Sequence, residues 1–137
     1  MLSVKRVGSI FTAVLALGAA SCGKSNQALV NRQWSDSFAY RISVEPMPPR
    51  AIEDATYRIV VQDKKTGEPI ETGQGRLFAN TQGGAGTNDG LAKGKEVGTY
   101  YARLRFVTAG DWAIGLQFRR DSTARFERVD WIQSVNN

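Results

Sequence analysis

Apolar side chains recur at every second position through most of this chain from residue 37 onward. In FAYRISV (38–44), apolar residues of one parity alternate with polar or small residues, and in TYRIVVQ (56–62) Tyr57, Ile59 and Val61 alternate with Arg58 and Gln62. Successive side chains of a strand point to opposite faces of its sheet, so this alternation predicts strands with one buried and one wet face. Apolar residues show no helical spacing in this part of the chain. The pattern therefore favours antiparallel β-sheets.

Two consecutive segments, GTYYARLRF and DWAIGLQFRR, carry the strongest form of this pattern. If they fold back on each other as an antiparallel hairpin, one register makes every inward pair apolar. A slip of one residue would divide the apolar set between the two faces. The sequence therefore predicts a hairpin in that register. Its inward pairs are Phe106–Trp112, Leu104–Ile114, Ala102–Leu116 and Tyr100–Phe118.

The rest of the chain completes an all-β pattern. One or two short strands are expected over residues 70–79, and a last strand over about 124–135, with a bulge near Arg128 where the alternation breaks. The glycine-rich stretch 83–94 is expected to be a long loop, because its spacing matches no phosphate-binding motif. Six or seven strands predict an antiparallel two-sheet immunoglobulin-like sandwich over residues 37–135, and a small barrel is the alternative.

The first 21 residues have the three parts of a secretory signal peptide. Lys5 and Arg6 give a positive start, an apolar stretch runs from Val7 to Leu17, and small residues follow up to Ser21. The apolar stretch is shorter than the roughly 20 residues that a membrane-spanning helix needs. We therefore expect residues 1–21 to direct export.

Cys22, the only cysteine of the chain, follows this segment directly and cannot form an internal disulfide. The stretch LGAASC resembles the lipobox of bacterial lipoproteins, whose cysteine takes a diacylglycerol and becomes the mature N-terminus. Ala19-x-Ser21 would also suit an ordinary signal peptidase, which would leave a soluble exported protein. We expect lipidation at Cys22, a flexible tether over residues 22–36, and a location in the bacterial cell envelope facing the periplasm or the exterior.

The composition narrows the classes of function. The chain contains no histidine, so Ser-His-Asp and Cys-His catalysis are excluded. The acidic residues Glu53 and Asp54, and Glu68 with Glu71, fall in predicted turns, where solvated surface side chains are expected rather than a glycosidase-type pair. We therefore expect a protein that is not an enzyme and that holds no cofactor or metal.

The net charge argues against nucleic acid as a partner. Removal of residues 1–21 removes Lys5 and Arg6 and no acidic side chain, which lowers the formal charge from +5 to +3. No run of Lys and Arg is longer than two residues. A nucleic-acid groove needs a denser basic stripe than this.

Several arginines and one tryptophan are the candidate binding residues. The predicted outward positions place Arg103, Arg105 and Arg119 on sheet faces, together with Arg41 and Arg58. They could spread over small neighbours on a solvated face, or they could form a basic patch that meets anionic lipid head groups or an acidic partner. Trp131, on the last strand, could anchor a partner if it is exposed.

The order of these segments resembles the YtkA-like domain, which is related to the FixH-like proteins. The residues that carry the resemblance are the turn KTGEPI after YRIVVQD, then Gly98-x-Tyr100 and Gly110-x-Trp112. The resemblance covers about residues 38–120 and implies a small exported or membrane-attached immunoglobulin-like sandwich. Some members of that family are associated with copper handling or terminal-oxidase assembly.

The chain offers few of the ligands that copper sites use, which are Met, His and Cys. After removal of the leader only Met47 and Cys22 remain. We therefore expect a membrane-anchored, non-enzymatic module that binds a protein or another envelope component. An accessory role in metal delivery or oxidase assembly, which the resemblance implies, is the alternative.

Overall fold

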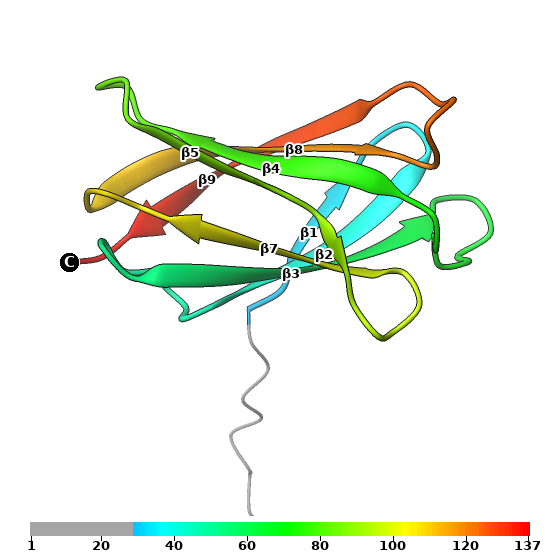
Figure 1. Cartoon of the computed structure of the whole chain (residues 1–137), viewed down its shortest axis with the longest axis horizontal. Helices are drawn as coiled ribbons and strands as arrows, with labels where there is room; N and C mark the ends of the chain where they lie inside the picture. Colours follow the sequence, from blue (N-terminus) through cyan, green and yellow to red (C-terminus); the bar gives the residue numbers. More distant parts are fainter. Residues whose placement is uncertain (1–28) are drawn as a thin grey trace, which may run out of the picture.

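The computed structural model describes residues 29–137, and none of these residues is helical. They form nine β-strands in two antiparallel sheets, which Figure 1 shows as two facing layers. The all-β, two-sheet prediction is confirmed, and the count of six or seven strands was too low. The strands are β1 Asn31–Trp34, β2 Phe38–Glu45, β3 Asp54–Asp63, β4 Gln74–Asn80, β5 Gly86–Gly90, β6 Ala92–Lys93, β7 Thr99–Arg105, β8 Gly110–Arg119 and β9 Glu127–Val135.

The strand order separates the two layers clearly. The five-stranded sheet has the order β1-β2-β3-β7-β6, and the four-stranded sheet has the order β5-β4-β8-β9. Each sheet keeps two edge strands, so the strands do not close into the small barrel that was the alternative. No helix long and apolar enough to span a membrane is found among residues 29–137.

The inward side chains of both sheets form one core, and the alternation predicted those of β2, β3, β7 and β8 correctly. In β2, for example, the four apolar residues of one parity are buried, and their neighbours are exposed or half-buried. The ring of Phe118 lies at the centre of an aromatic cluster, with centroid distances of 5.0 Å to Phe38, 6.0 Å to Tyr40 and 5.4 Å to Tyr100. These pairs meet edge to face, the arrangement that aromatic quadrupoles favour.

The predicted hairpin between residues 98 and 120 is wrong, because β7 and β8 belong to different sheets. Leu104 lies opposite Ala55 of β3, and Ile114 lies opposite Ala79 of β4. Alternation defines which face of a strand is buried but not which strand lies beside it. Two strands from facing sheets bury the same residues as a hairpin would.

The connection between β7 and β8 is therefore an arch that crosses from one layer to the other. The rings of Phe106 and Trp112, which the hairpin prediction placed opposite each other, do meet, with centroids 5.1 Å apart and planes at 66°. Both side chains are fully buried. The indole Nε1 of Trp112 donates to the carbonyl oxygen of Thr108, 3.0 Å away, which closes the arch.

Two further expectations about strands need correction. Part of the expected tether, residues 31–34, is strand β1, which pairs with β2. Its inward members Asn31 and Gln33 are polar, so the segment lacks the apolar signal of a strand. Strand β9 pairs with β8 without a break from Glu127 to Val135, so the bulge near Arg128 is absent from this pairing.

The glycine-rich stretch also contains strands. β5 pairs with β4 along its whole length, and β6 pairs with β7, so the chain crosses between the sheets at Leu91. The carboxylate of Asp89 accepts a bond of 2.8 Å from the backbone N–H of Arg103 and ties the two layers together at this side. Pairing with established strands here overrides the low strand propensity of Gly, Asn and Asp.

Two buried tyrosines differ in how their hydroxyls are satisfied. Tyr100 donates to the carbonyl oxygen of Ile70 and accepts from the backbone N–H of Gly73, 2.9 Å away, so it holds the connection between β3 and β4. The hydroxyl of Tyr57 is buried and has no hydrogen-bond partner among the described residues. Burial raises the pKa of both phenols, which stay neutral.

Candidate functional site

The outer face of the five-stranded sheet carries arginines on four neighbouring strands or strand ends. Arg32 of β1 lies directly opposite Arg41 of β2. Arg58 of β3 lies one step diagonally from Arg41, because Arg41 is opposite Val60. Arg103 and Arg105 follow on β7, opposite Thr56 and Asp54. We call this surface, made by Arg32, Arg41, Arg58, Arg103 and Arg105, the arginine face.

Two of these arginines have acidic partners. The Nη2 atom of Arg58 lies 2.8 Å from Oε2 of Glu96, and the Nη1 atom of Arg105 lies 3.8 Å from Oδ1 of Asp54. Partial desolvation acts to lower the pKa of Arg58, but bonding to Glu96 and Tyr101 outweighs it and the pKa is raised. Both pairs are well exposed, so each adds little to stability.

The other three arginines of the face have no such partner. Within residues 29–137, no carboxylate oxygen lies within 4.0 Å of the guanidinium groups of Arg32, Arg41 or Arg103. Like charges directly opposite each other on neighbouring strands destabilise a sheet, as at Arg32 and Arg41. An anion that bound between them would remove this repulsion.

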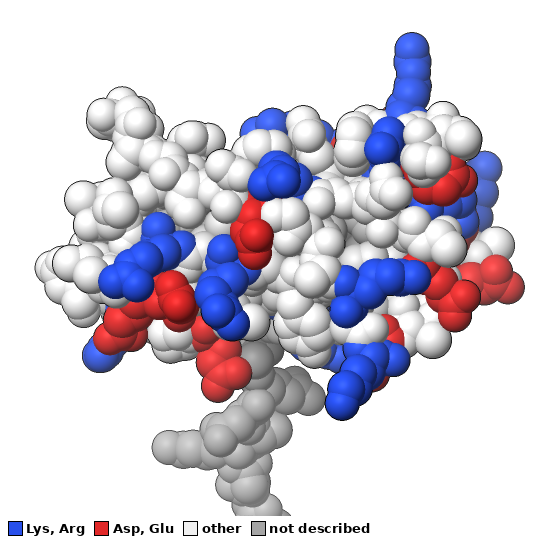
Figure 2. Space-filling view, viewed as in Figure 1, with Lys and Arg blue, Asp and Glu red and all other residues white. Residues whose placement is uncertain are grey.

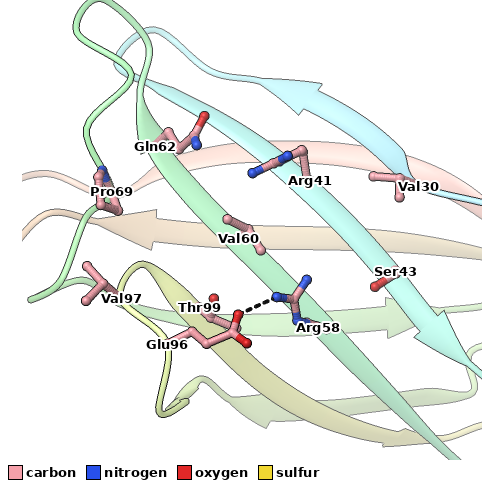
Figure 3. Close-up of a pocket in the computed structure, with 10 residues that line it drawn as sticks. All are labelled: Val30, Arg41, Ser43, Arg58, Val60, Gln62, Pro69, Glu96, Val97 and Thr99. Carbon is pink, nitrogen blue, oxygen red and sulfur yellow. Dashed lines mark hydrogen bonds and ion pairs between the residues drawn. The ribbon is translucent and has the colours of Figure 1, made fainter. Parts of the chain in front are cut away.

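A shallow groove of about 420 Å³ lies on this face (Figure 3). Its polar lining comes from Arg41, Ser43, Arg58, Gln62 and Thr99, and from Glu96, whose carboxylate is paired with Arg58, around the apolar side chain of Val60. Guanidinium, amide and hydroxyl groups donate hydrogen bonds, and a guanidinium can hold a carboxylate or phosphate with two parallel bonds. The groove therefore suits an anionic group better than a cation.

Two amphipathic aromatic side chains lie on the same face. Trp34 of β1 is 58% exposed and lies opposite Ala39, and Tyr101 of β7 is 38% exposed and lies opposite Arg58. Large aromatic rings are costly to leave in water, and Trp and Tyr are enriched at protein and membrane interfaces for this reason. The face thus combines unpaired cations with exposed rings.

The structure does not bring the predicted binding residues onto one surface. Arg103 and Arg105 belong to the arginine face, whereas Arg119 lies on the outer face of the four-stranded sheet, because β7 and β8 are in different sheets. Arg119 is already engaged within the protein, since its guanidinium stacks 4.4 Å from the ring centre of Phe126 and donates to Gln74. Trp131 is half-buried on the inner side of β9 and packs against the core.

Sequence reasoning missed Arg32 and Trp34, which fell in the expected tether. Their spacing of two residues is a strand signal, but Asn31 and Gln33 on the other side of the strand are polar, so no apolar stripe marks it. The positions of Arg41 and Arg58 were predicted correctly as outward. Only the pairing of β1 with β2 shows that Arg32 and Trp34 share a surface with Arg41 and Arg58, and a single sequence does not reveal that pairing.

Acidic side chains lie on the arginine face as well, where Glu45, Asp54 and Glu96 accompany the arginines, and the other surfaces also mix the two charges. On the side of the molecule in Figure 2, Lys and Arg side chains are interspersed with Asp and Glu. Arg120 pairs with Asp63 near the β3–β4 turn, and Arg128 pairs with Asp130 on β9. A groove near Phe38 and Phe126 is lined by residues of both signs. These surfaces give no concentration of one charge.

Metal ligands are sparse in the described part of the chain. Residues 29–137 contain no group of three or more His, Cys, Asp and Glu side chains placed to hold a metal ion. Met47 is 44% exposed in the connection between β2 and β3. Cys22 and the expected signal peptide, residues 1–21, lie outside the described residues.

No family model matches this sequence, and no curated protein or solved structure matches it either. The resemblance to the YtkA-like and FixH-like domains therefore stays a prediction.

Proposed function

We propose that this protein is a lipoprotein of the bacterial cell envelope, anchored through Cys22, whose immunoglobulin-like sandwich binds an anionic envelope component without catalysing a reaction. The order of a leader, a small-residue site and one cysteine supports the anchor. The two facing antiparallel sheets support a sandwich of this class. The arginine face is the binding surface.

One observation carries the proposal: Arg32 and Arg41 lie directly opposite each other on an exposed face and lack an acidic partner among the described residues. Such a pair costs stability in the free protein, and a bound anion relieves that cost. The groove beside them adds hydroxyl and amide donors from Ser43 and Gln62. Binding needs no catalytic group and no conformational change of the sheet.

The anchor is tested by fractionation of cells that produce the wild type or Cys22→Ala. The wild type should remain with membranes after a high-salt wash, and the variant should move to the soluble envelope fraction. Equal retention of both proteins would contradict the anchor.

The binding surface is tested with two charge-reversed double variants that change the net charge equally. Arg32→Glu/Arg41→Glu alters the arginine face, and Arg76→Glu/Arg125→Glu alters exposed arginines elsewhere. Each is combined with Cys22→Ala and mixed with washed envelope membranes at low ionic strength. Only the first double variant should lose binding, and equal loss in both would show that net charge alone determines binding.

A further inference from the structure

The described chain begins on the arginine face. Val30 lines the groove together with Arg41 and Ser43, and Figure 3 shows these three side chains at the same side of the groove. In Figure 1 the described chain starts on the side of the five-stranded sheet that faces away from β4 and β8. Any attachment that precedes residue 29 therefore reaches the domain from the side of this face.

Few residues separate Cys22 from the first residue that the structure describes. Leu29 lies seven residue-to-residue steps after Cys22, and a fully extended chain spans about 3.3–3.6 Å per step, which gives at most about 25 Å. The outer face of the second sheet lies farther away by the thickness of the two layers, whose backbones alone are about 10 Å apart. An anchor at Cys22 thus keeps the arginine face closest to the membrane surface.

The two outer faces also differ in whether the guanidinium groups of their arginines have hydrogen-bond partners. On the four-stranded sheet, Arg76 donates to Asn88 at 2.7 Å, Arg119 to Gln74, and Arg128 to Asp130 at 3.0 Å. On the five-stranded sheet, the side chains of Arg32, Arg41 and Arg103 have no hydrogen-bond partner within residues 29–137. The face nearest the anchor is the one with free guanidinium groups.

We propose that the arginine face rests on an anionic phospholipid surface, with Arg32, Arg41 and Arg103 against lipid phosphates and Trp34 in the interfacial layer. This inference rests on the proposed lipid anchor at Cys22. Basic side chains beside an anchor add electrostatic attraction to an anionic membrane, and Trp occupies the boundary between head groups and acyl chains. The two acyl chains of a diacylglycerol already hold the protein at the membrane, so the electrostatic contact orients the domain.

A lipid surface fits this site better than an acidic protein does. The free arginines extend over β1, β2 and β7 on an open sheet face rather than around one deep pocket. A planar array of phosphates meets such a face without a complementary shape. The connection to the anchor is also too short to leave room for a folded domain of ordinary diameter beneath this face.

The orientation is measured with cysteines introduced on the two outer faces. A lipid on Cys22 consumes the only native thiol, so an added cysteine is the only one that a membrane-impermeant maleimide can label. Thr56→Cys and Ala113→Cys are matched, because both positions are exposed and lie on inner strands, β3 and β8, of their sheets. The full-length proteins are extracted in detergent and reconstituted into phosphatidylcholine vesicles with or without phosphatidylglycerol.

In detergent both cysteines should react at similar rates. In vesicles with phosphatidylglycerol, labelling of Thr56→Cys should fall by at least about tenfold relative to Ala113→Cys, because each of the three arginines changes the equilibrium by about fivefold near an anionic surface. Combining Thr56→Cys with Arg32→Glu/Arg41→Glu, or raising the salt concentration, should restore the labelling of this cysteine. Quenching of Trp34 fluorescence by brominated phosphatidylglycerol, compared with Trp34→Phe, gives a second readout that needs no new cysteine.

Three results would overturn the inference in distinguishable ways. Equal labelling of the two cysteines in anionic vesicles, without quenching of Trp34, would show that the face is free while the anchor holds. Protection in native membranes but not in pure-lipid vesicles would assign the face to an acidic protein. Labelling of Cys22 in the wild-type protein would show that its thiol carries no lipid, which would contradict both the anchor and the proposed orientation.

Discussion

The contrast between Tyr57 and Tyr100 gives a prediction about stability that can be worked out from the structure. Both rings are buried, so the substitutions Tyr57→Phe and Tyr100→Phe keep the packing of the ring and remove one hydroxyl each. The hydroxyl of Tyr57 has no partner among the described residues, whereas that of Tyr100 bonds Ile70 and Gly73. The two variants therefore isolate the effect of hydrogen bonding.

Only one of the two substitutions is expected to lower the free energy of unfolding. An unpartnered buried hydroxyl loses its water and gains no bond in return, so Tyr57→Phe should leave the free energy of unfolding unchanged or raise it by about 1–2 kcal/mol. Tyr100→Phe removes two bonds and leaves the carbonyl of Ile70 and the N–H of Gly73 without a partner. That loss should cost about 2–3 kcal/mol.

Urea unfolding followed by tryptophan fluorescence measures both changes, because Trp112 is fully buried and becomes exposed on unfolding. The slope of the free energy against urea should stay the same in all three proteins, which shows that only stability has changed. A loss of more than about 1 kcal/mol in Tyr57→Phe would mean that its hydroxyl has a partner such as a buried water. Equal losses in both variants would refute the reasoning.

Four further substitutions test the fold and its electrostatics. Leu104→Asp should cost more than about 4 kcal/mol, because it buries an unpaired carboxylate, whereas Arg103→Asp on the exposed face should leave circular dichroism and the unfolding midpoint almost unchanged. Gly98→Ala should cost at least about 1–3 kcal/mol in thermal or urea unfolding, because Gly98 has a φ of 74° and a Cβ there would lie 2.6 Å from Cβ of Pro69. The backbone N–H groups of the turn after Asp63 and one guanidinium donate hydrogen bonds to its carboxylate, and these bonds lower its pKa from 3.8 to about 2. The contribution of Asp63 to stability is therefore present above pH 3.8 and is lost as the pH falls through about 2. Urea midpoints at several pH values should therefore differ most between the wild type and Asp63→Asn above about pH 4 and converge below about pH 2.

The buried set of this protein could be predicted from the sequence, because the two-residue period of a strand is a local property. Tyr57, Ile59, Leu104 and Ile114 all point inward as their parity indicated. The choice of neighbouring strand depends on the whole topology. The sequence therefore could not show that Leu104 and Ile114 belong to facing sheets rather than to one hairpin.

The same limit applied to the candidate site. Arg103 and Arg105 were predicted as outward and are outward, but Arg119 lies on the other outer face because its strand is in the other sheet. Arg32 and Trp34 joined the site only through the pairing of β1 with β2, and the polar inner side of β1 hid that strand. Residue type and parity thus identified candidate side chains, whereas strand pairing decided which of them share a surface.

The arch between β7 and β8 has a consequence for the order in which the chain folds. Phe106 and Trp112 are only six residues apart, yet their contact joins the two layers, so the loop that they close has a low entropic cost. The pairings of β3 with β7 and of β4 with β8 link residues much farther apart in the chain and should form later. We expect the folding nucleus at this arch, with each sheet growing outward from it.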